Sequence, residues 1–221
     1  MTARVRLTVC DAGPFTLDRS DLMVGARGPL TVPSTVVVIE HPSHGLVLFD
    51  TGVNHRVADG AGADEHWGPG LRERYGATLF TREHAVDAHL ERLVVRPLTA
   101  RGYALGDYLP GRGFDYLELT GDADLFEDGS LRVVRLPGHT PGSQGLVVDL
   151  PDRGRVAFVG DAAHLPEQVT ADVPQISDWN VEAKLLSYQR LRAMRRAGIR
   201  PFLSHDVDDF AALPTGGEYW S

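Results

Sequence analysis

Residues 135–161 read RLPGHTPGSQGLVVDLPDRGRVAFVGD and predict a β-hairpin with polar residues at its open end. The apolar runs GLVVDL and RVAFVGD flank the turn PDRG, whose glycine suits a tight connection. His139 precedes the outgoing strand and Asp161 follows the returning one. Because a hairpin brings its two free ends together, we expect His139 and Asp161 to lie at the same end of a sheet.

The next unit of the chain adds a third polar residue to this end of the sheet. A helix predicted over residues 181–197 leads to a strand that ends at Ser204, just before His205. A strand–helix–strand crossover makes its two strands parallel neighbours, so Asp161 and His205 both follow carboxyl ends of strands. Two imidazoles and a carboxylate suit Zn²⁺, Fe²⁺ or Mn²⁺. The topology therefore predicts a metal site formed by His139, Asp161 and His205.

The remaining pattern predicts an α/β sandwich, with sheets inside and helices outside, formed by residues 1–221 as a single domain. Its expected elements are a hairpin over residues 35–52, a long irregular loop over 53–78, a helix over 81–93, a loop over 101–115 and a strand over 116–122. We expect Asp178 or Asn180 to cap the N-terminus of the helix over residues 181–197. The apolar residues expected on its buried face are Ala183, Leu186, Met194 and Ala197.

Composition excludes several classes of function. The formal net charge of −8 disfavours binding to nucleic-acid phosphates. The longest apolar stretches fall short of the roughly 18 residues that span a membrane, and the N-terminus lacks signal-peptide features. Cys10 is the only cysteine, which rules out an internal disulfide and a cysteine-based zinc site. We therefore expect a cytoplasmic protein with a small-molecule substrate, and we leave a homo-oligomer open.

Four motifs together resemble the metallo-β-lactamase superfamily, in particular its N-acyl homoserine lactonase branch. They are VLFDTG at residues 47–52, PGHTPGS around His139, VGDAAHLPE around Asp161 and LSHD around His205. The resemblance implies an αββα sandwich. It also implies that His139, Asp161 and His205 contact a pair of metals, usually zinc, which Asp161 bridges, and that the metals polarise a lactone or ester carbonyl.

One part of the family pattern is absent from the sequence. In the family, an H-x-H-x-D-H motif downstream of a helix resembling TREHAVDAHLERL supplies the other ligands, but no such motif follows residues 81–93 here. The resemblance therefore predicts a metallo-β-lactamase-like sandwich reduced by loss of a strand–loop–helix unit between Leu93 and Pro97. It predicts at most a mononuclear metal site.

Other histidines are candidates for the vacant ligand positions. His164 follows Asp161 by three residues, where the lactonase branch often carries a tyrosine that stabilises an oxyanion, and it is expected to act as a fourth ligand or a general acid. His55 and His66 are weaker candidates in the glycine-rich loop. His41 and His44 flank a hairpin turn and are expected to be solvated. Aromatic residues expected to wall a pocket or to plug a gap are Trp67, Tyr75, Phe80, Tyr103 and Tyr108.

Three hypotheses for the function follow. The first is hydrolysis of a lactone, ester or thioester, with one metal on His139, Asp161 and His205, completed by water or His164, and with Asp161 and His164 as catalytic residues. The second is a metal-independent acid–base enzyme of the cyclase, dehydratase or lyase type on the same fold. The third is a catalytically inactive binding relic.

Overall fold

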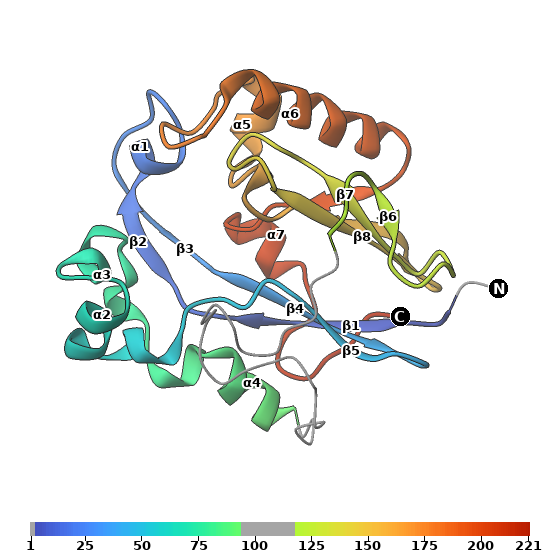
Figure 1. The fold of residues 1–221 in the computed structure, drawn as a ribbon, viewed down its shortest axis with the longest axis horizontal. Coiled ribbons are helices and arrows are strands. Elements are labelled where there is room, and N and C mark those ends of the chain that lie inside the picture. Colours follow the sequence, from blue (N-terminus) through green and yellow to red (C-terminus); the bar gives the residue numbers. More distant parts are fainter. Residues whose placement is uncertain (1–2, 94–117) are drawn as a thin grey trace.

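Two β-sheets packed face to face, with helices on their outer faces, form the centre of the computed structural model (Figure 1), which describes residues 3–93 and 118–221. The first sheet has the order β1 (Arg6–Asp11), β4 (Thr35–His41), β5 (Gly45–Phe49). The second has the order β10 (Arg200–Phe202), β9 (Gly154–Phe158), β8 (Gln144–Leu150), β7 (Leu131–Arg135), β6 (Ala123–Asp124). A separate hairpin pairs β2 (Phe15–Asp18) with β3 (Pro29–Val32). The layers are those of the predicted αββα sandwich.

Strand pairing agrees with the predicted hairpins and parallel crossover. The β8–β9 pair is antiparallel and places Leu146 opposite Phe158, while β10 runs parallel to β9 with Phe202 opposite Phe158. The β4–β5 pair forms the hairpin expected within residues 35–52. Since β9 and β10 are parallel neighbours, the loops that follow them emerge at the same edge of the second sheet.

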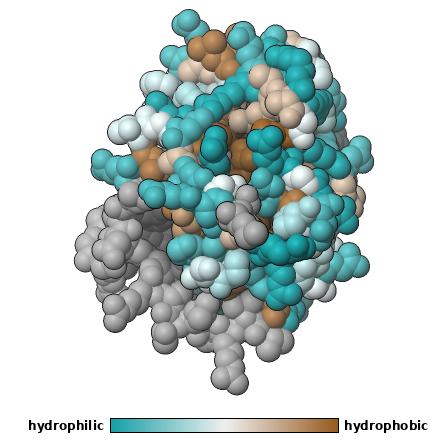
Figure 2. Space-filling model, turned by 90° about the vertical axis from the view of Figure 1, so that its right-hand side faces the viewer, coloured by the Kyte–Doolittle hydropathy of each residue, from teal (hydrophilic) through white to brown (hydrophobic). Residues whose placement is uncertain are grey.

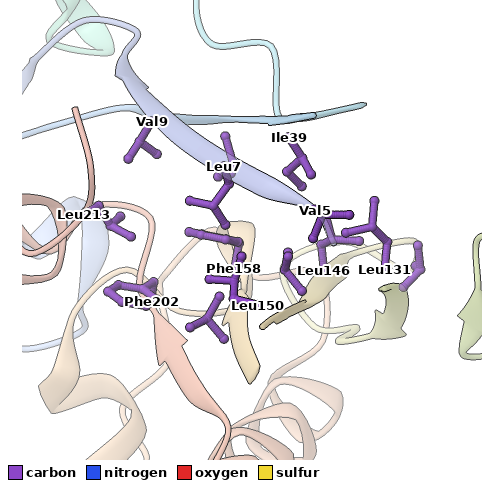
Figure 3. Packing of buried hydrophobic residues seen from close by; sticks show 14 residues of the cluster. Val5, Leu7, Val9, Ile39, Leu131, Leu146, Leu150, Phe158, Phe202 and Leu213 are labelled. Carbon is purple, nitrogen blue, oxygen red and sulfur yellow. The ribbon is translucent and has the colours of Figure 1, made fainter. Parts of the chain in front are cut away.

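The main core lies between the two sheets (Figure 3). Val5, Leu7, Val9 and Ile39 from the first sheet and the segment before it face apolar side chains of the second sheet, and all are almost fully buried. Their partners are Leu131, Val133, Leu146, Val148, Leu150, Val156, Phe158 and Phe202. Burial of this apolar surface is the dominant favourable contribution to folding.

Helices cover the outer face of each sheet. Tyr188, Leu191 and Met194 of α6 (Val181–Arg196) pack on the second sheet. Val86 and Leu90 of α4 (Val86–Arg92) pack on the first. The other helices are α1 (Arg19–Leu22), α2 (Gly60–His66), α3 (Leu71–Arg74), α5 (Pro166–Ala171) and α7 (Val207–Ala211), with short 3₁₀ turns η1 (His55–Ala58), η2 (Ala77–Leu79), η3 (Arg82–His84) and η4 (Gly160–Ala162). Among the described residues, no helix is long and apolar enough to cross a membrane.

The outer surface matches this division between apolar interior and polar exterior. Over the described residues of the face in Figure 2, hydrophilic side chains predominate and hydrophobic ones gather in small groups. This distribution is ordinary for a folded domain whose large apolar side chains are withdrawn into the layers.

Three predictions about secondary structure were wrong. Residues 53–78 form the helices α2 and α3 and two 3₁₀ turns rather than an irregular loop, because the carboxylate of Asp59 caps α2 by accepting a hydrogen bond from the N–H of Gly62 at 2.6 Å. The helix over 81–93 is divided at Ala85 into η3 and α4. Residues 118–122 form no strand, since the Asp122 carboxylate, rather than a neighbouring strand, accepts the N–H of Arg135 at 3.0 Å.

The predicted buried stripe of α6 was only partly right: Met194 is buried as expected, whereas Ala197 is exposed. Asn180 caps the helix by accepting the N–H of Ala183, but Leu186 is 58% exposed. Lys184, Ser187 and Tyr188 are buried instead. Polar side chains can occupy a buried helix face when loops supply their hydrogen-bond partners, and the pattern along one helix does not reveal those loops. The predicted loss of a strand–loop–helix unit, the loop over residues 101–115, and Tyr103 and Tyr108 lie outside the described residues.

The turn histidine His41 is buried, which corrects its expected solvation. Its Nε2 lies 3.0 Å from Asp128 Oδ2, and its Nδ1 accepts the backbone N–H of Ser43 at 3.1 Å, so Nε2 carries the proton and donates it. The exposed His44 ring stacks on Phe126 at a centroid distance of 4.0 Å. These contacts connect the turn between β4 and β5 to the segment before β7, and so join the two sheets at their edge.

We predict that Asp128→Asn weakens this connection in a pH-dependent way. The Ser130 hydroxyl and N–H, and then His41, lower the pKa of Asp128 to about 2, so its stabilising effect is complete above about pH 4 and disappears as the pH falls toward 2. Urea denaturation at pH 7 should show a loss of about 1–2 kcal/mol in the free energy of unfolding. The difference between the wild-type protein and the variant should shrink near pH 3; a difference that is the same at both pH values would contradict this account.

Candidate metal centre

One carboxylate and three imidazoles gather at the edge of the second sheet where β9 and β10 end. Asp161 Oδ2 lies 3.6 Å from His139 Nε2, while Asp161 Oδ1 lies 3.7 Å from both His205 Nε2 and His164 Nδ1. The structure thus brings together the three residues that the topology selected, and His164 joins them. His139 comes from the β7–β8 loop, Asp161 from η4, and His205 from the segment after β10.

Close backbone packing holds the loop that carries His139. The carbonyls of His139 and Gly138 accept the N–H groups of Trp179 and Asn180, both at 3.1 Å, just before α6 begins. Gly138 has φ +140°, and a Cβ added there would lie 2.4 Å from Lys184 Cα. Only glycine fits between this loop and the helix, so the conformation of the PGHTPGS loop depends on Gly138.

A buried ion pair lies directly behind the centre. The ammonium of Lys184 donates to Asp178 Oδ1 at 2.9 Å and to the backbone carbonyl of Asp161 at 2.8 Å, and both charged side chains are fully buried. The same Asp178 oxygen lies 3.3 Å from His139 Nδ1. Because a carboxylate can only accept, His139 carries its proton on Nδ1 and presents the Nε2 lone pair to Asp161.

Sequence reasoning missed this ion pair, although one signal was visible. Lys184 is the only lysine of the chain and lies four residues before the buried Tyr188, on the same helix face. Burial lowers the pKa of Lys184, and the hydrogen bond and charge of Asp178 oppose that shift. Burial works to raise the pKa of Asp178, but its hydrogen bonds from His139 and Lys184 outweigh burial and lower it.

His164 and His205 are each held by a partner on the far side of the ring. His205 Nδ1 lies 2.7 Å from the carbonyl of Pro33, which can only accept, so Nε2 has the free lone pair. His164 Nε2 lies 2.7 Å from Gln175 Oε1. Both residues therefore direct an unprotonated nitrogen at the Asp161 carboxylate.

The charges at the centre favour a cation. Burial opposes ionisation of Asp161, but the positive charge of His164, His205 and His139 in their protonated forms, and of Lys184, outweighs burial and lowers the pKa of Asp161. Burial lowers the pKa of His164 to about 3, which leaves its ring neutral near pH 7. Asp161, His164 and His205 offer ligand atoms that all lie within 4.8 Å of one another. Imidazole nitrogens around a carboxylate form a donor set that suits Zn²⁺ or Fe²⁺.

A pocket of about 340 Å³ opens over this centre, with Asp161 and His205 in its lining. Its walls are largely apolar and come from the β2–β3 hairpin and from the helical segment after β5; they include Phe15, Leu17, Val32, Val53, Trp67 and Tyr75. Trp67 and Tyr75 thus occupy the wall positions expected of them. Phe80 does not line this pocket; it is buried behind the wall, in a cluster with Val53 and Val57.

The other candidate ligands lie outside the group of metal-capable side chains found among the described residues. His55 lies in η1 and His66 at the end of α2, and neither belongs to that group. Asp50 is in the pocket lining, with φ +68°, and its carboxylate accepts the N–H groups of Thr51 and Gly52 at 2.6 and 2.8 Å. Its contacts organise the loop at the pocket edge.

Comparisons with known proteins find a matching family model and similar curated sequences. The Metallo-beta-lactamase superfamily profile matches residues 66–197. An N-acyl homoserine lactonase AttM from Azorhizobium caulinodans is 29% identical over 133 residues, which cover 54% of this chain and 47% of that protein. AttM from Rhizobium radiobacter is 30% identical over 125 residues, which cover 54% and 47%. The chain spans about half the length of the curated relatives it matches.

Solved structures resemble the fold over almost its whole length. An N-acyl homoserine lactone hydrolase with the product N-hexanoyl-L-homoserine at its catalytic metal centre has a TM-score of 0.80 and 20% identity, covering 99% of this chain and 100% of that chain. A quorum-quenching N-acyl homoserine lactone lactonase has a TM-score of 0.78 and 20% identity, covering 99% of each chain. These likenesses confirm the predicted αββα fold.

We predict that Lys184→Met destabilises the protein by about 3–5 kcal/mol, because it leaves the Asp178 carboxylate buried without a cation. The double variant Lys184→Met/Asp178→Asn should lose less than the sum of its two single changes, which denaturant titrations of all four proteins would measure as a coupling energy. Arg82→Met, which removes a half-exposed ion pair with Asp87, is the control and should cost under about 1 kcal/mol. Additive single changes would show that Lys184 and Asp178 act independently.

Proposed function

This chain belongs to the metallo-beta-lactamase superfamily, and from that premise we propose that it is a metal-dependent hydrolase of lactones, with N-acyl homoserine lactones as its substrate class. The observation that carries the proposal is one carboxylate, Asp161, surrounded by three imidazoles at the base of an apolar pocket. The lactonase names of the matched relatives support the choice of substrate class.

Asp161 and His205 would hold the metal, with His139 and His164 on either side of the carboxylate. When bound, Zn²⁺ or a similar divalent ion polarises the carbonyl of a lactone or ester. The protein's own contribution is to fix the tautomers of the neutral rings: the Pro33 carbonyl accepts the Nδ1–H of His205, and Asp178 accepts that of His139, so that each Nε2 faces the centre. Asp161 keeps about half of its side chain exposed, so a substrate can approach the centre from the pocket.

The pocket suits a ligand with a polar head and an apolar tail. Its volume of about 340 Å³ lies at the small end of the usual range for ligand sites. The pocket lining includes the polar side chains of Asp161 and His205. Its apolar walls include Leu17, Val32 and Trp67. A lactone ring at the centre would direct its acyl chain along these walls, where burial contributes roughly 0.8 kcal/mol for each CH₂ group.

We predict that activity depends on a metal. Hydrolysis of N-hexanoyl homoserine lactone, followed by acid release, should disappear after dialysis against a chelator and return on addition of Zn²⁺. Asp161→Ala should lower kcat/KM at least about 100-fold, because it removes the carboxylate shared by all three imidazoles, equivalent to about 2.7 kcal/mol of transition-state stabilisation. Undiminished hydrolysis after metal removal would favour the metal-independent acid–base enzyme, and inactivity in every metal-loaded sample would favour the binding relic.

We also predict that Trp67→Ala reduces the preference for longer acyl chains. Trp67 contacts Tyr75 edge-to-face at 5.6 Å between ring centroids and forms part of the apolar wall. The ratio of kcat/KM for decanoyl over butanoyl homoserine lactone should fall about tenfold, mainly through KM, since uniform binding is lost. Trp179→Ala, at a tryptophan that is 59% exposed and outside this lining, is the control. An unchanged ratio would place the acyl chain elsewhere.

A further inference from the structure

The ring of His164 contains a buried nitrogen that the fold leaves without a hydrogen bond. His164 is 2% exposed, and its Nδ1 is the only buried side-chain nitrogen or oxygen in the described part of the chain that lacks a hydrogen-bond partner. A buried polar atom in this condition destabilises the fold, and such atoms are rare in native proteins. The atom faces Asp161 Oδ1 across 3.7 Å, too far for a hydrogen bond.

The hydrogen bonds on the far side of the His164 ring determine which of its two nitrogens carries the proton. Gln175 donates its amide Nε2–H to the carbonyl of Asp21 at 2.9 Å, which orients its Oε1 toward His164. That oxygen accepts the His164 Nε2–H at 2.7 Å. The backbone is fixed too, because Gln168 Oε1 accepts the N–H of His164 at 2.8 Å. In its neutral form, His164 therefore presents the Nδ1 lone pair to the centre.

Three electron-pair donors thus face one another: Asp161 Oδ1, His164 Nδ1 and His205 Nε2. One proton can bridge a single pair of these atoms, whereas one cation contacts all three. Two ligands about 2.1 Å from a tetrahedral Zn²⁺ are separated by roughly 3.4 Å, close to the observed spacing of 3.7 Å from Asp161 Oδ1 to each nitrogen. His139 faces the other carboxylate oxygen, Oδ2, at 3.6 Å.

We propose that His164 is a metal ligand through Nδ1, completing with Asp161 and His205 a three-residue centre on the Oδ1 side of the carboxylate, and that Gln175 is the positioning residue that fixes its tautomer. The assignment rests on the proposed metal-dependent function. It gives His164 the role of ligand in preference to general acid, since its one ring N–H in the neutral form points away from the pocket toward Gln175. Three protein ligands leave a coordination position open to substrate.

The test measures metal binding rather than activity. Zn²⁺ affinity is determined by competition with a chromophoric chelator for the wild-type protein and for His164→Phe, which fills the same space without a nitrogen. We expect an affinity loss of at least about 100-fold in His164→Phe and about 10–100-fold in Gln175→Met, which keeps the side-chain length but removes the acceptor. His41→Phe replaces an equally buried histidine far from the centre and should leave Zn²⁺ affinity unchanged.

Loading the protein with Co²⁺ gives spectra that would not change if His164 had only a structural role. In the Co²⁺-loaded wild-type protein, the ring N–H groups of bound His164 and His205 should each give a solvent-exchangeable, strongly shifted proton resonance. His164→Phe should lose one of these resonances and shift the visible Co²⁺ absorption. Gln175→Met should keep Co²⁺ bound at saturating metal while the His164 resonance broadens through solvent exchange.

The outcomes separate this inference from the proposed function. Equal Zn²⁺ affinity and unchanged Co²⁺ spectra in His164→Phe, with loss of binding in His139→Phe, would overturn the inference and leave a metal hydrolase in which His139 completes the site. A folded wild-type protein that binds neither Zn²⁺ nor Co²⁺ would overturn both. If His164→Phe fails to fold, the test depends on Gln175→Met. Wild-type Zn²⁺ affinity and an unbroadened His164 proton resonance in Gln175→Met would overturn the proposal.

Discussion

The buried ammonium of Lys184 is the interaction on which the rest of the centre depends. It donates to the Asp161 carbonyl and to the Asp178 carboxylate, and thereby joins the loop after β9 to the segment before α6. Asp178 in turn accepts the backbone N–H of Gln175 at 2.8 Å and contacts His139. A charge in this position is tolerated only when every one of its partners is present, so the fold either assembles the whole arrangement or leaves an unpaired buried ion.

The second constraint is that distant backbone carbonyls orient the imidazoles. Pro33 accepts from His205, and the Asp21 carbonyl holds the Gln175 amide that contacts His164. Both carbonyls belong to the segment around the β2–β3 hairpin, well over a hundred residues from the rings they serve. The same hairpin forms part of the pocket wall. The orientation of the imidazoles and the shape of the pocket therefore depend on one small element that belongs to neither main sheet, and a shift of this hairpin would alter both.

The sequence allowed the layers and the convergence of His139, Asp161 and His205 to be predicted, because hairpins and parallel crossovers have few geometric solutions. It did not reveal the partners of those side chains. Lys184 lies on a helix whose apolar pattern favoured Leu186 for burial, and only the position of the Asp178 loop explains why the ammonium is inside. His41 was expected to be solvated because it flanks a hairpin turn, and its partner, Asp128, lies 87 residues away in the sequence. Pairwise polar contacts of this range leave no periodic pattern.

A centre with few protein ligands depends strongly on how well each is held before a metal arrives. An H-x-H-x-D-H motif would add donors, and this sequence has none. The compensating feature is rigidity: Gly138 allows its loop to contact α6 directly, Gln168 fixes the backbone of His164, and Gln175 fixes its ring. Since these contacts form as part of folding, little additional ordering is required when a cation binds. Under the proposed function, this preorganisation of Asp161, His164 and His205 is what would allow a centre with three protein ligands to bind a metal where a flexible site would need more.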